Sequence, residues 1–292
     1  MNLSKLIRAH PVGTYYIVTL LISWGGLVFV LGGLDQISLY QVNASFLPLY
    51  LVTVAGPCVA GILLTGLYDG VKGYREFLSR LIKWRVETKW YVAALFIAPF
   101  TVFTALFALS LFSPVFQPGI LSSAENPVAS SFGLPGASKI ELFLFVVMLG
   151  LFNGLVEELG WTGFVAPRLR SNHSLITAGA LNLGFMWGLW HFLSNYLGSA
   201  NEAGTLTVPL YLVITLFSFL PPFRIIMLWV YKHTESLLIA ILMHASLDVF
   251  WILSMPAVLT GHQRAIWYLV WAAVLWGIVA VIGKEGRRLK RS

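Results

Sequence analysis

The chain has 292 residues, of which 58% are hydrophobic and only 11% are charged. Soluble domains are about half apolar and about a quarter charged, so this composition excludes an ordinary soluble protein and indicates a polytopic membrane protein. The net charge of +7 does not indicate a nucleic-acid partner, because the basic residues gather at the ends of apolar runs, where they set membrane topology.

Eight stretches are long and apolar enough to cross a bilayer, whose core needs about 20 helical residues. The expected spans are residues 12–34, 45–67, 89–113, 139–160, 174–196, 206–231, 235–255 and 263–283. The fold class we expect is therefore all-α, a polytopic membrane protein with about eight transmembrane helices. With eight spans, most Lys and Arg residues fall on one side of the membrane, which predicts a multi-pass plasma-membrane protein with both termini in the cytoplasm.

The segments between the spans suggest a division of the chain into three parts. In residues 68–88, apolar and basic residues alternate at near-helical spacing, which predicts a short amphipathic helix on the inner leaflet. Residues 114–138 are rich in Ser, Pro and Gly and predict an external loop. We expect N-terminal spans in residues 1–138, a functional core in 139–256, and a last span with a basic cytoplasmic tail in 257–292.

Few ionisable side chains fall inside the expected spans. Such groups are costly in hydrocarbon and by default mark a functional site. They are Glu157, Glu158, His191, Arg224, His244 and Asp248. The two glutamates are adjacent in the stretch VEELGW, and adjacent helical residues point about 100° apart. One carboxylate can therefore face a cavity while the other faces a neighbouring helix.

Two further patterns place polar groups on single helix faces. The stretch WGLWH puts Trp187 and His191 four residues apart, and HASLD does the same for His244 and Asp248. At about 1.5 Å of rise per residue, these groups and Glu157 can meet on the cytoplasmic half of the bilayer. We read Trp161, Trp187 and Trp190 as packing residues, and Asn153 and Asn182 as polar contacts between helices.

A carboxylate, two imidazoles and a second carboxylate in one apolar pocket suit the activation of water for hydrolysis. The carboxylate can act as a general base, and the imidazoles can hold the water or stabilise a developing oxyanion. The four side chains Glu157, His191, His244 and Asp248 could also bind Zn²⁺, which accepts His nitrogens and carboxylate oxygens. The residues leave open whether the cofactor is zinc or whether there is none.

At these positions the sequence resembles the CAAX prenyl endopeptidase and bacteriocin-processing (Abi) family. Its members are multi-span membrane proteins that carry EExxxR, FxxxH and HxxxN or HxxxD motifs in that order, matched here by EELGWT, WGLWH and HASLD over roughly residues 139–256. The resemblance implies an intramembrane endopeptidase in which Glu157 is the general base and His191 helps to bind water. His244 with Asp248 would stabilise the oxyanion, and Glu158 would support them. Eukaryotic members remove the last three residues of prenylated proteins.

The chain departs from the family pattern at two positions, because Thr162 stands in place of the motif arginine and Trp187 in place of the phenylalanine. An arginine at position 162 would neutralise Glu158 from one helical turn away, whereas Thr162 offers only a hydroxyl. Arg224 is the basic residue deepest inside an expected span. We hypothesise that Arg224 supplies the missing charge to Glu158, and we count Thr162, Trp187 and Arg224 with Glu158 as supporting residues of the site.

Three functions follow from these observations. The first is an intramembrane endopeptidase that cleaves a peptide or protein substrate, lipid-modified or not, near the cytoplasmic side. The second is a proton-coupled transporter, although the chain lacks the two similar halves typical of transporters. The third is a catalytically degenerate family member that acts by binding, for instance in bacteriocin immunity, and the missing motif arginine favours it. The substrate, the metal state and the oligomeric state stay open.

Overall fold

The computed structural model describes residues 7–33, 46–121, 132, 134, 136–169, 174–198, 203–256 and 258–288, and within these ranges every regular element is a helix. The α-helices are α2 (Pro11–Leu31), α3 (Phe46–Leu81), α4 (Thr88–Ser110), α6 (Lys139–Gly160), α7 (Phe185–Gly198), α8 (Val208–Phe217), α9 (Leu220–Thr234), α10 (Leu237–Ser254) and α11 (Gly261–Arg288). The shorter 3₁₀ and π helices are η2 (Pro114–Phe116), η3 (Gly119–Leu121), η4 (Trp161–Val165), η5 (Ala166–Arg168) and η6 (Thr177–Gly184). The expected all-α fold is confirmed.

Among the described residues, seven helices are long and apolar enough to cross a membrane. They are Pro11–Leu31, Leu47–Leu81, Thr88–Ser110, Lys139–Arg168, Val208–Thr234, Leu237–Ser254 and Gly261–Gly283. The expected fifth span, 174–196, is not among them. It consists of η6 followed by α7, and Asn182, His191 and Asn195 make it less apolar than the others. This helix packs inside the bundle against α2, α8 and α9, which is where polar groups are tolerated in a membrane protein.

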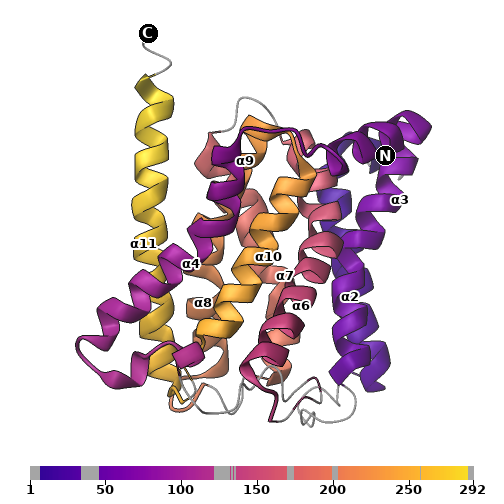
Figure 1. Cartoon of the computed structure of the whole chain (residues 1–292). Helices are drawn as coiled ribbons and strands as arrows, with labels where there is room; N and C mark the ends of the chain where they lie inside the picture. Colours follow the sequence, from indigo (N-terminus) through magenta and orange to yellow (C-terminus); the bar gives the residue numbers. More distant parts are fainter. Residues whose placement is uncertain are drawn as a thin grey trace.

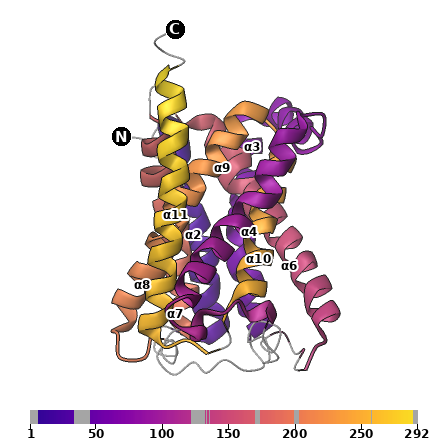
Figure 2. The ribbon, with the colours of Figure 1, turned by 60° about the vertical axis from the view of Figure 1, so that its left-hand side comes forward.

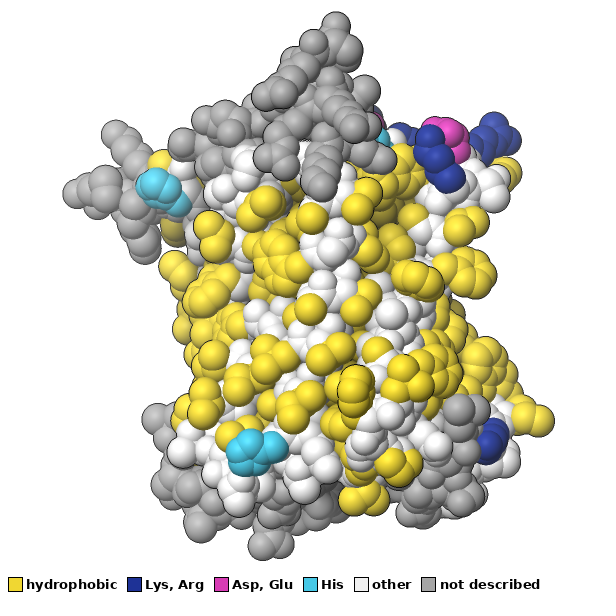
Figure 3. Space-filling view, turned by 90° about the vertical axis from the view of Figure 1, so that its left-hand side faces the viewer, with side chains coloured by type: hydrophobic (Ala, Val, Ile, Leu, Met, Phe, Trp, Pro, Cys, Tyr) yellow, Lys and Arg dark blue, Asp and Glu magenta, His cyan; other side chains and the backbone are white. Residues whose placement is uncertain are grey.

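The described helices form one bundle in which α2 begins and α11 ends at the same end (Figures 1 and 2). Apolar side chains cover the middle of the face in Figure 3, and its charged side chains lie near the two ends. Large apolar side chains such as Phe29 and Phe100 are well exposed, as expected for a surface that faces lipid. Residues 122–131, 133 and 135 of the expected loop and 289–292 of the basic tail lie outside the described residues.

The amphipathic helix expected at residues 68–88 is shorter than predicted. Helix α3 continues to Leu81, but Gly70, with φ 59° and ψ −148°, interrupts its helical geometry. Such a positive φ is readily adopted only by glycine. Beyond this kink, Phe77 is buried against Leu237, whereas Leu78 is 54% exposed. Residues 82–87 turn the chain back toward α4 instead of continuing the helix.

Two glycines bring α6 close to α10, and this contact is the most extensive between any two described elements. A Cβ atom at Gly154 would lie 2.6 Å from the carbonyl oxygen of Ile241, and one at Gly150 would lie 2.8 Å from that of Ala245. A small residue at every fourth position is the usual way in which membrane helices approach each other closely. This packing sets Glu157 and Glu158 beside the polar residues of α10.

Candidate functional site

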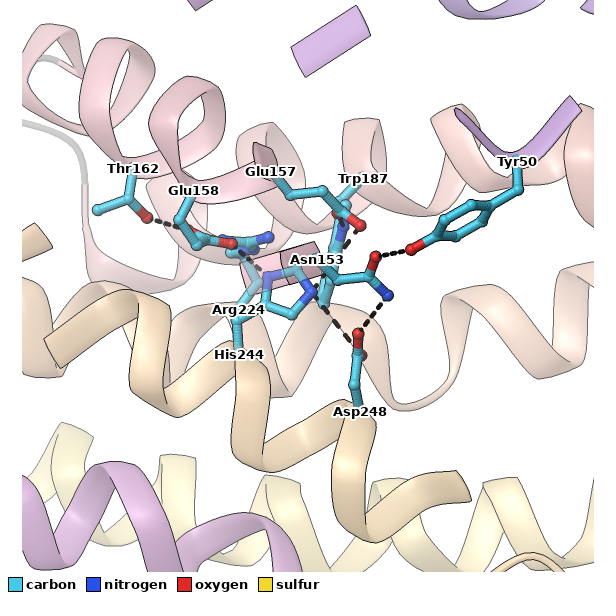
Figure 4. Close-up of polar contacts among 9 residues, drawn as sticks. All are labelled: Tyr50, Asn153, Glu157, Glu158, Thr162, Trp187, Arg224, His244 and Asp248. Carbon is cyan, nitrogen blue, oxygen red and sulfur yellow. Dashed lines mark hydrogen bonds and ion pairs between the residues drawn. The ribbon is translucent and has the colours of Figure 1, made fainter. Parts of the chain in front are cut away.

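Glu157 and Glu158, near the end of α6, are both buried, with 2% and 0% of their surface exposed. Their side chains diverge, as expected for neighbours in a helix. Glu157 lines a cavity of about 310 Å³ within the bundle, and Glu158 points instead toward α9 and α10 (Figure 4). The two acids therefore have different partners and can have different roles.

Glu158 is held by three side chains from three elements. Nη1 of Arg224 on α9 donates to both carboxylate oxygens at 2.8 Å, and Nδ1 of His244 on α10 lies 2.7 Å from Oε1. The hydroxyl of Thr162 on η4 donates to Oε2. The hypothesised ion pair between Arg224 and Glu158 is thus present, and Thr162 supplies the hydroxyl that the sequence allowed. Charge and hydrogen bonds together satisfy a buried carboxylate that would otherwise be very costly.

The local sequence of α9 explains how Arg224 reaches this depth. Helix α8 ends at Phe217, and α9 starts at Leu220 with Pro221 in its first turn, a position that proline favours because it needs no N–H donor there. The break brings Arg224 into the bundle, where it is 1% exposed. Its guanidinium carbon lies 4.0 Å from the centre of the Trp187 ring, a cation–π contact that further stabilises the buried charge.

Glu157 receives one direct hydrogen bond, from Nε1 of Trp187 to Oε2 at 2.8 Å. Its other oxygen, Oε1, lies 3.9 Å from Nε2 of His244, and this nitrogen lies 3.7 Å from Oδ1 of Asp248. Both distances are too long for a direct hydrogen bond. The Nε2 atom of His244 therefore faces two carboxylates across a gap at the wall of the cavity.

His244 has a defined orientation because its two ring nitrogens face different groups. An ionised carboxylate only accepts hydrogen bonds, so Nδ1 of His244 must donate its hydrogen to Glu158. Nε2 is therefore the ring nitrogen that is available to groups in the cavity. The second partner of a histidine commonly sets its tautomer in this way. Arg224, Glu158 and His244 thus form one continuous chain of contacts behind the cavity.

Asp248, one helical turn after His244, is held by a second chain of contacts (Figure 4). Nδ2 of Asn153 donates to Oδ2 of Asp248 at 2.8 Å. The hydroxyl of Tyr50 on α3 in turn donates to Oδ1 of Asn153. This chain links three helices, as expected for Asn153, and it fixes the position of the Asp248 carboxylate.

His191 lies in the same cavity as Glu157, His244 and Asp248. Its ring packs between Trp190 and Trp187, with centroid distances of 4.5 Å and 5.7 Å. The side chain is half-buried and makes no hydrogen bond to any part of the chain that the structure describes. The structure therefore brings all four expected catalytic residues to one cavity, with His191 held by aromatic packing.

The remaining walls of the cavity are largely apolar. They come from α2, α3, α6, α7 and α10 and include Leu27, Leu49, Val54, Leu149, Trp251 and Ile252. Such a combination, a mostly apolar pocket with a few polar groups that converge, is typical of a small-molecule or substrate site. The ionisable residues of the cavity, Glu157, His191, His244 and Asp248, come from α6, α7 and α10.

The donor set does not fit a resident metal ion as these side chains lie. Within the described ranges, no group of three or more His, Cys, Asp or Glu side chains is arranged to hold one. Nδ1 of His244 is committed to Glu158, and one oxygen of each cavity carboxylate accepts a hydrogen bond from Trp187 or Asn153. The chemistry below is therefore derived from the side chains alone.

The hydrogen-bond roles of three side chains were not foreseen from the sequence. Trp187 was counted among the supporting residues and read as packing, but it also donates to Glu157; its position four residues before His191 was a signal that both face the site. Asn153 precedes Glu157 by four residues and so shares its helix face, yet it was read only as a contact between helices. Nothing in the sequence indicated a role for Tyr50, because it lies 103 residues before Asn153 in the chain.

Comparison with known proteins agrees with the resemblance drawn from the motifs. Residues 139–250 match the model of a family described as type II CAAX prenyl endopeptidase Rce1-like. A curated relative, CAAX prenyl protease 2 of Methanococcus maripaludis, is 25% identical over 171 residues, which are 58% of this chain. The chain spans 59% of that relative's length. Residues 139–250, which include Glu157, His191, His244 and Asp248, are thus similar to the Rce1-like CAAX prenyl endopeptidase family.

Proposed function

We propose that this protein is an intramembrane endopeptidase that hydrolyses a peptide bond within the bundle. The observation that carries the proposal is the arrangement of one cavity: Glu157, His191, His244 and Asp248, from three helices, line it together. Each of these ionisable groups is costly in a membrane, and by default such groups mark a functional site. A hydrolytic site explains why they lie together.

Water activation is assigned to Glu157 and His191. Trp187 holds Oε2 of Glu157, which leaves Oε1 facing the gap beside His244. A water molecule there would donate to Oε1 and be held by the half-buried ring of His191. Glu157 takes a proton from this water while the water oxygen attacks the carbonyl carbon of the peptide, which is general base catalysis.

Attack converts the carbonyl into a tetrahedral intermediate with a negatively charged oxygen. Nε2 of His244, when protonated, donates to this oxygen, and Asp248 beside it helps to position the donors. The intermediate collapses when the C–N bond breaks. The proton held by Glu157 then passes to the leaving nitrogen, which restores the carboxylate and releases an amine and a carboxylic acid.

Glu158, Arg224 and Thr162 have a positioning role in this scheme. They do not line the cavity. Glu158 instead holds Nδ1 of His244, and Arg224 and Thr162 fix Glu158. The arrangement keeps the imidazole pointed at the cavity without a rotation at the moment of reaction, which is the basis of electrostatic preorganisation.

The apolar walls support a substrate that brings an apolar group into the membrane. Leu27, Leu149 and Ile252 would contact a large aliphatic side chain or a lipid modification on a peptide tail. The name of the relative, CAAX prenyl protease 2, favours a prenylated C-terminal peptide as the first class to test. We place cleavage on the cytoplasmic side of the plasma membrane, with both termini cytoplasmic, on the basis of the distribution of basic residues.

The alternatives gain less support. The binding-only reading, including a role in bacteriocin immunity, rested on the absent motif arginine, and Arg224 occupies the position next to Glu158 that such a residue would fill. A proton-coupled transporter would also use buried carboxylates and histidines. It remains the second candidate, because α8 and α9 are separated by a break of the kind that transporters place at substrate sites.

The proposal is tested with purified protein in liposomes and a pair of fluorogenic peptides. One peptide carries a farnesylated C-terminal Cys-aliphatic-aliphatic-X sequence, and the other has the same sequence without the lipid. We expect the wild type to cleave the farnesylated peptide and Glu157→Ala to be inactive. Equal rates for the wild type and Glu157→Ala would contradict the catalytic assignment. Equal cleavage of both peptides would contradict the lipid preference alone.

A further inference from the structure

The oxyanion in the proposed reaction needs hydrogen-bond donors, and Asp248 is poorly suited to be one. An ionised carboxylate only accepts hydrogen bonds, and its negative charge would oppose a developing negative charge nearby. In this structure Asp248 is used as an acceptor, with Oδ2 2.8 Å from Nδ2 of Asn153. The side-chain amide of Asn153, which donates this hydrogen bond to Asp248, is a neutral donor at the cavity wall.

The hydrogen-bond inventory of Asn153 leaves one donor for the cavity. A primary amide nitrogen carries two hydrogens. One points to Asp248, and within the described chain Nδ2 has no second acceptor. The amide oxygen accepts from Tyr50, so the oxygen and the nitrogen are each held by a different partner. Both Asn153 and Glu157 line the cavity, and they lie four residues apart on one face of α6.

Other hydroxyl groups in the cavity wall are already committed. Thr53 donates its hydroxyl hydrogen to the carbonyl oxygen of Leu49 at 2.8 Å. Ser194 donates its own to the carbonyl oxygen of His191 at 3.0 Å. Each hydroxyl has a single hydrogen. These two side chains would have to break an existing bond before they could stabilise an oxyanion, whereas Asn153 would not.

We infer that Asn153 is a further catalytic residue of this site, whose second amide N–H donates to the carbonyl oxygen of the peptide as it becomes an oxyanion. Tyr50 and Asp248 are positioning residues that hold the amide in this orientation. The inference rests on the proposed peptidase function. The neutral donor then comes from Asn153 on α6, and Asp248 orients it by accepting the other amide hydrogen.

The test compares the wild type, Asn153→Ala, Tyr50→Phe and Glu157→Ala in liposomes with the farnesylated peptide. Loss of one oxyanion donor typically lowers kcat by about 100-fold to 1,000-fold, so we expect this loss for Asn153→Ala with KM nearly unchanged. Tyr50→Phe keeps the amide but releases its oxygen, and we expect a smaller loss, on the order of tenfold. A raised KM with unchanged kcat in Asn153→Ala would overturn the inference.

A second measurement separates this role from a structural one. A peptide aldehyde, whose hydrate resembles the tetrahedral intermediate, should bind Asn153→Ala more weakly by about the factor lost in kcat. An analogue with a methylene amine in place of the scissile amide has no carbonyl oxygen and should bind both proteins equally. Equal weakening of both analogues would indicate a disturbed fold and overturn the inference.

The kcat values separate this inference from the proposed function. Full kcat in Asn153→Ala while Glu157→Ala is inactive would overturn the inference and leave the proposed function standing. Full activity of both variants would overturn the inference and the proposed function.

Discussion

Removal of the charge on Arg224 should strongly destabilise the protein, because it leaves the buried carboxylate of Glu158 without the guanidinium that donates to both of its oxygens. Both side chains are almost inaccessible, with 1% and 0% exposed, and the charged contact is 2.8 Å. Removal of one partner from a buried ion pair costs about 3–5 kcal/mol. We expect this loss for Arg224→Met, in which the unbranched side chain can still pack against Trp187.

The double variant tests the physical cause directly. Glu158→Gln with Arg224→Met removes both charges, and replacement of a whole buried pair is often neutral or stabilising. We therefore expect the double variant to be more stable than Arg224→Met alone, with a coupling free energy of about 3 kcal/mol. The cation–π contact with Trp187 is lost in both variants, so it cancels from the comparison.

The assay is thermal unfolding of the purified proteins in detergent, followed by tryptophan fluorescence. For a chain of this size, a loss of about 3–5 kcal/mol should lower Tm by roughly 10 °C. The matched control is Lys83→Met, which breaks the ion pair of Lys83 with Glu235 at 3.6 Å, where the side chains are 40% and 77% exposed. An exposed pair contributes about 0–1 kcal/mol. Our account of Glu158 is wrong if the effects of Glu158→Gln and Arg224→Met on the free energy of unfolding are additive. It is also wrong if Arg224→Met lowers Tm no more than Lys83→Met does.

Three further predictions concern packing and the site. Gly154→Ala should lower Tm because its Cβ would lie 2.6 Å from the carbonyl oxygen of Ile241, while Gly277→Ala, with open space around it, should keep or raise Tm; equal shifts would contradict the close contact of α6 with α10. Trp187→Phe keeps an aromatic ring but removes the donor to Glu157, and we expect kcat to fall by about tenfold; an unchanged kcat would show that this bond does not matter. Peptide cleavage should survive dialysis against a chelator, because the described side chains form no metal site; loss of activity that zinc restores would contradict this.

Much of the fold was predictable because a membrane span leaves a strong signal in the sequence. Apolar runs of about 20 residues locate the helices well. The fifth expected span is less apolar than the others, because it contains Asn182, His191 and Asn195, and it is not among the helices long and apolar enough to cross a membrane. These polar residues are tolerated because the helix lies inside the bundle. The end of the amphipathic helix at Leu81 depends on the turn into α4, which periodicity does not show.

The candidate site was partly predictable from spacing. The divergence of Glu157 from Glu158 follows from helix geometry, and the pairing of Arg224 with Glu158 follows from the rule that a charge buried in a membrane needs a partner. The contacts of Trp187, Asn153 and Tyr50 depend on which helices become neighbours, and no local pattern reports this. The sequence could thus indicate which charges belong together, but not the donors that orient them.

The central claim is that Glu157 makes this protein a hydrolase of peptide bonds. The most direct test compares new N- and C-terminal peptides in membranes from cells that express the wild type or Glu157→Ala at equal levels. Our account predicts termini present only with the wild type, which would also reveal the cleaved bond. Identical sets of termini, with both proteins folded and equally abundant, would contradict the account.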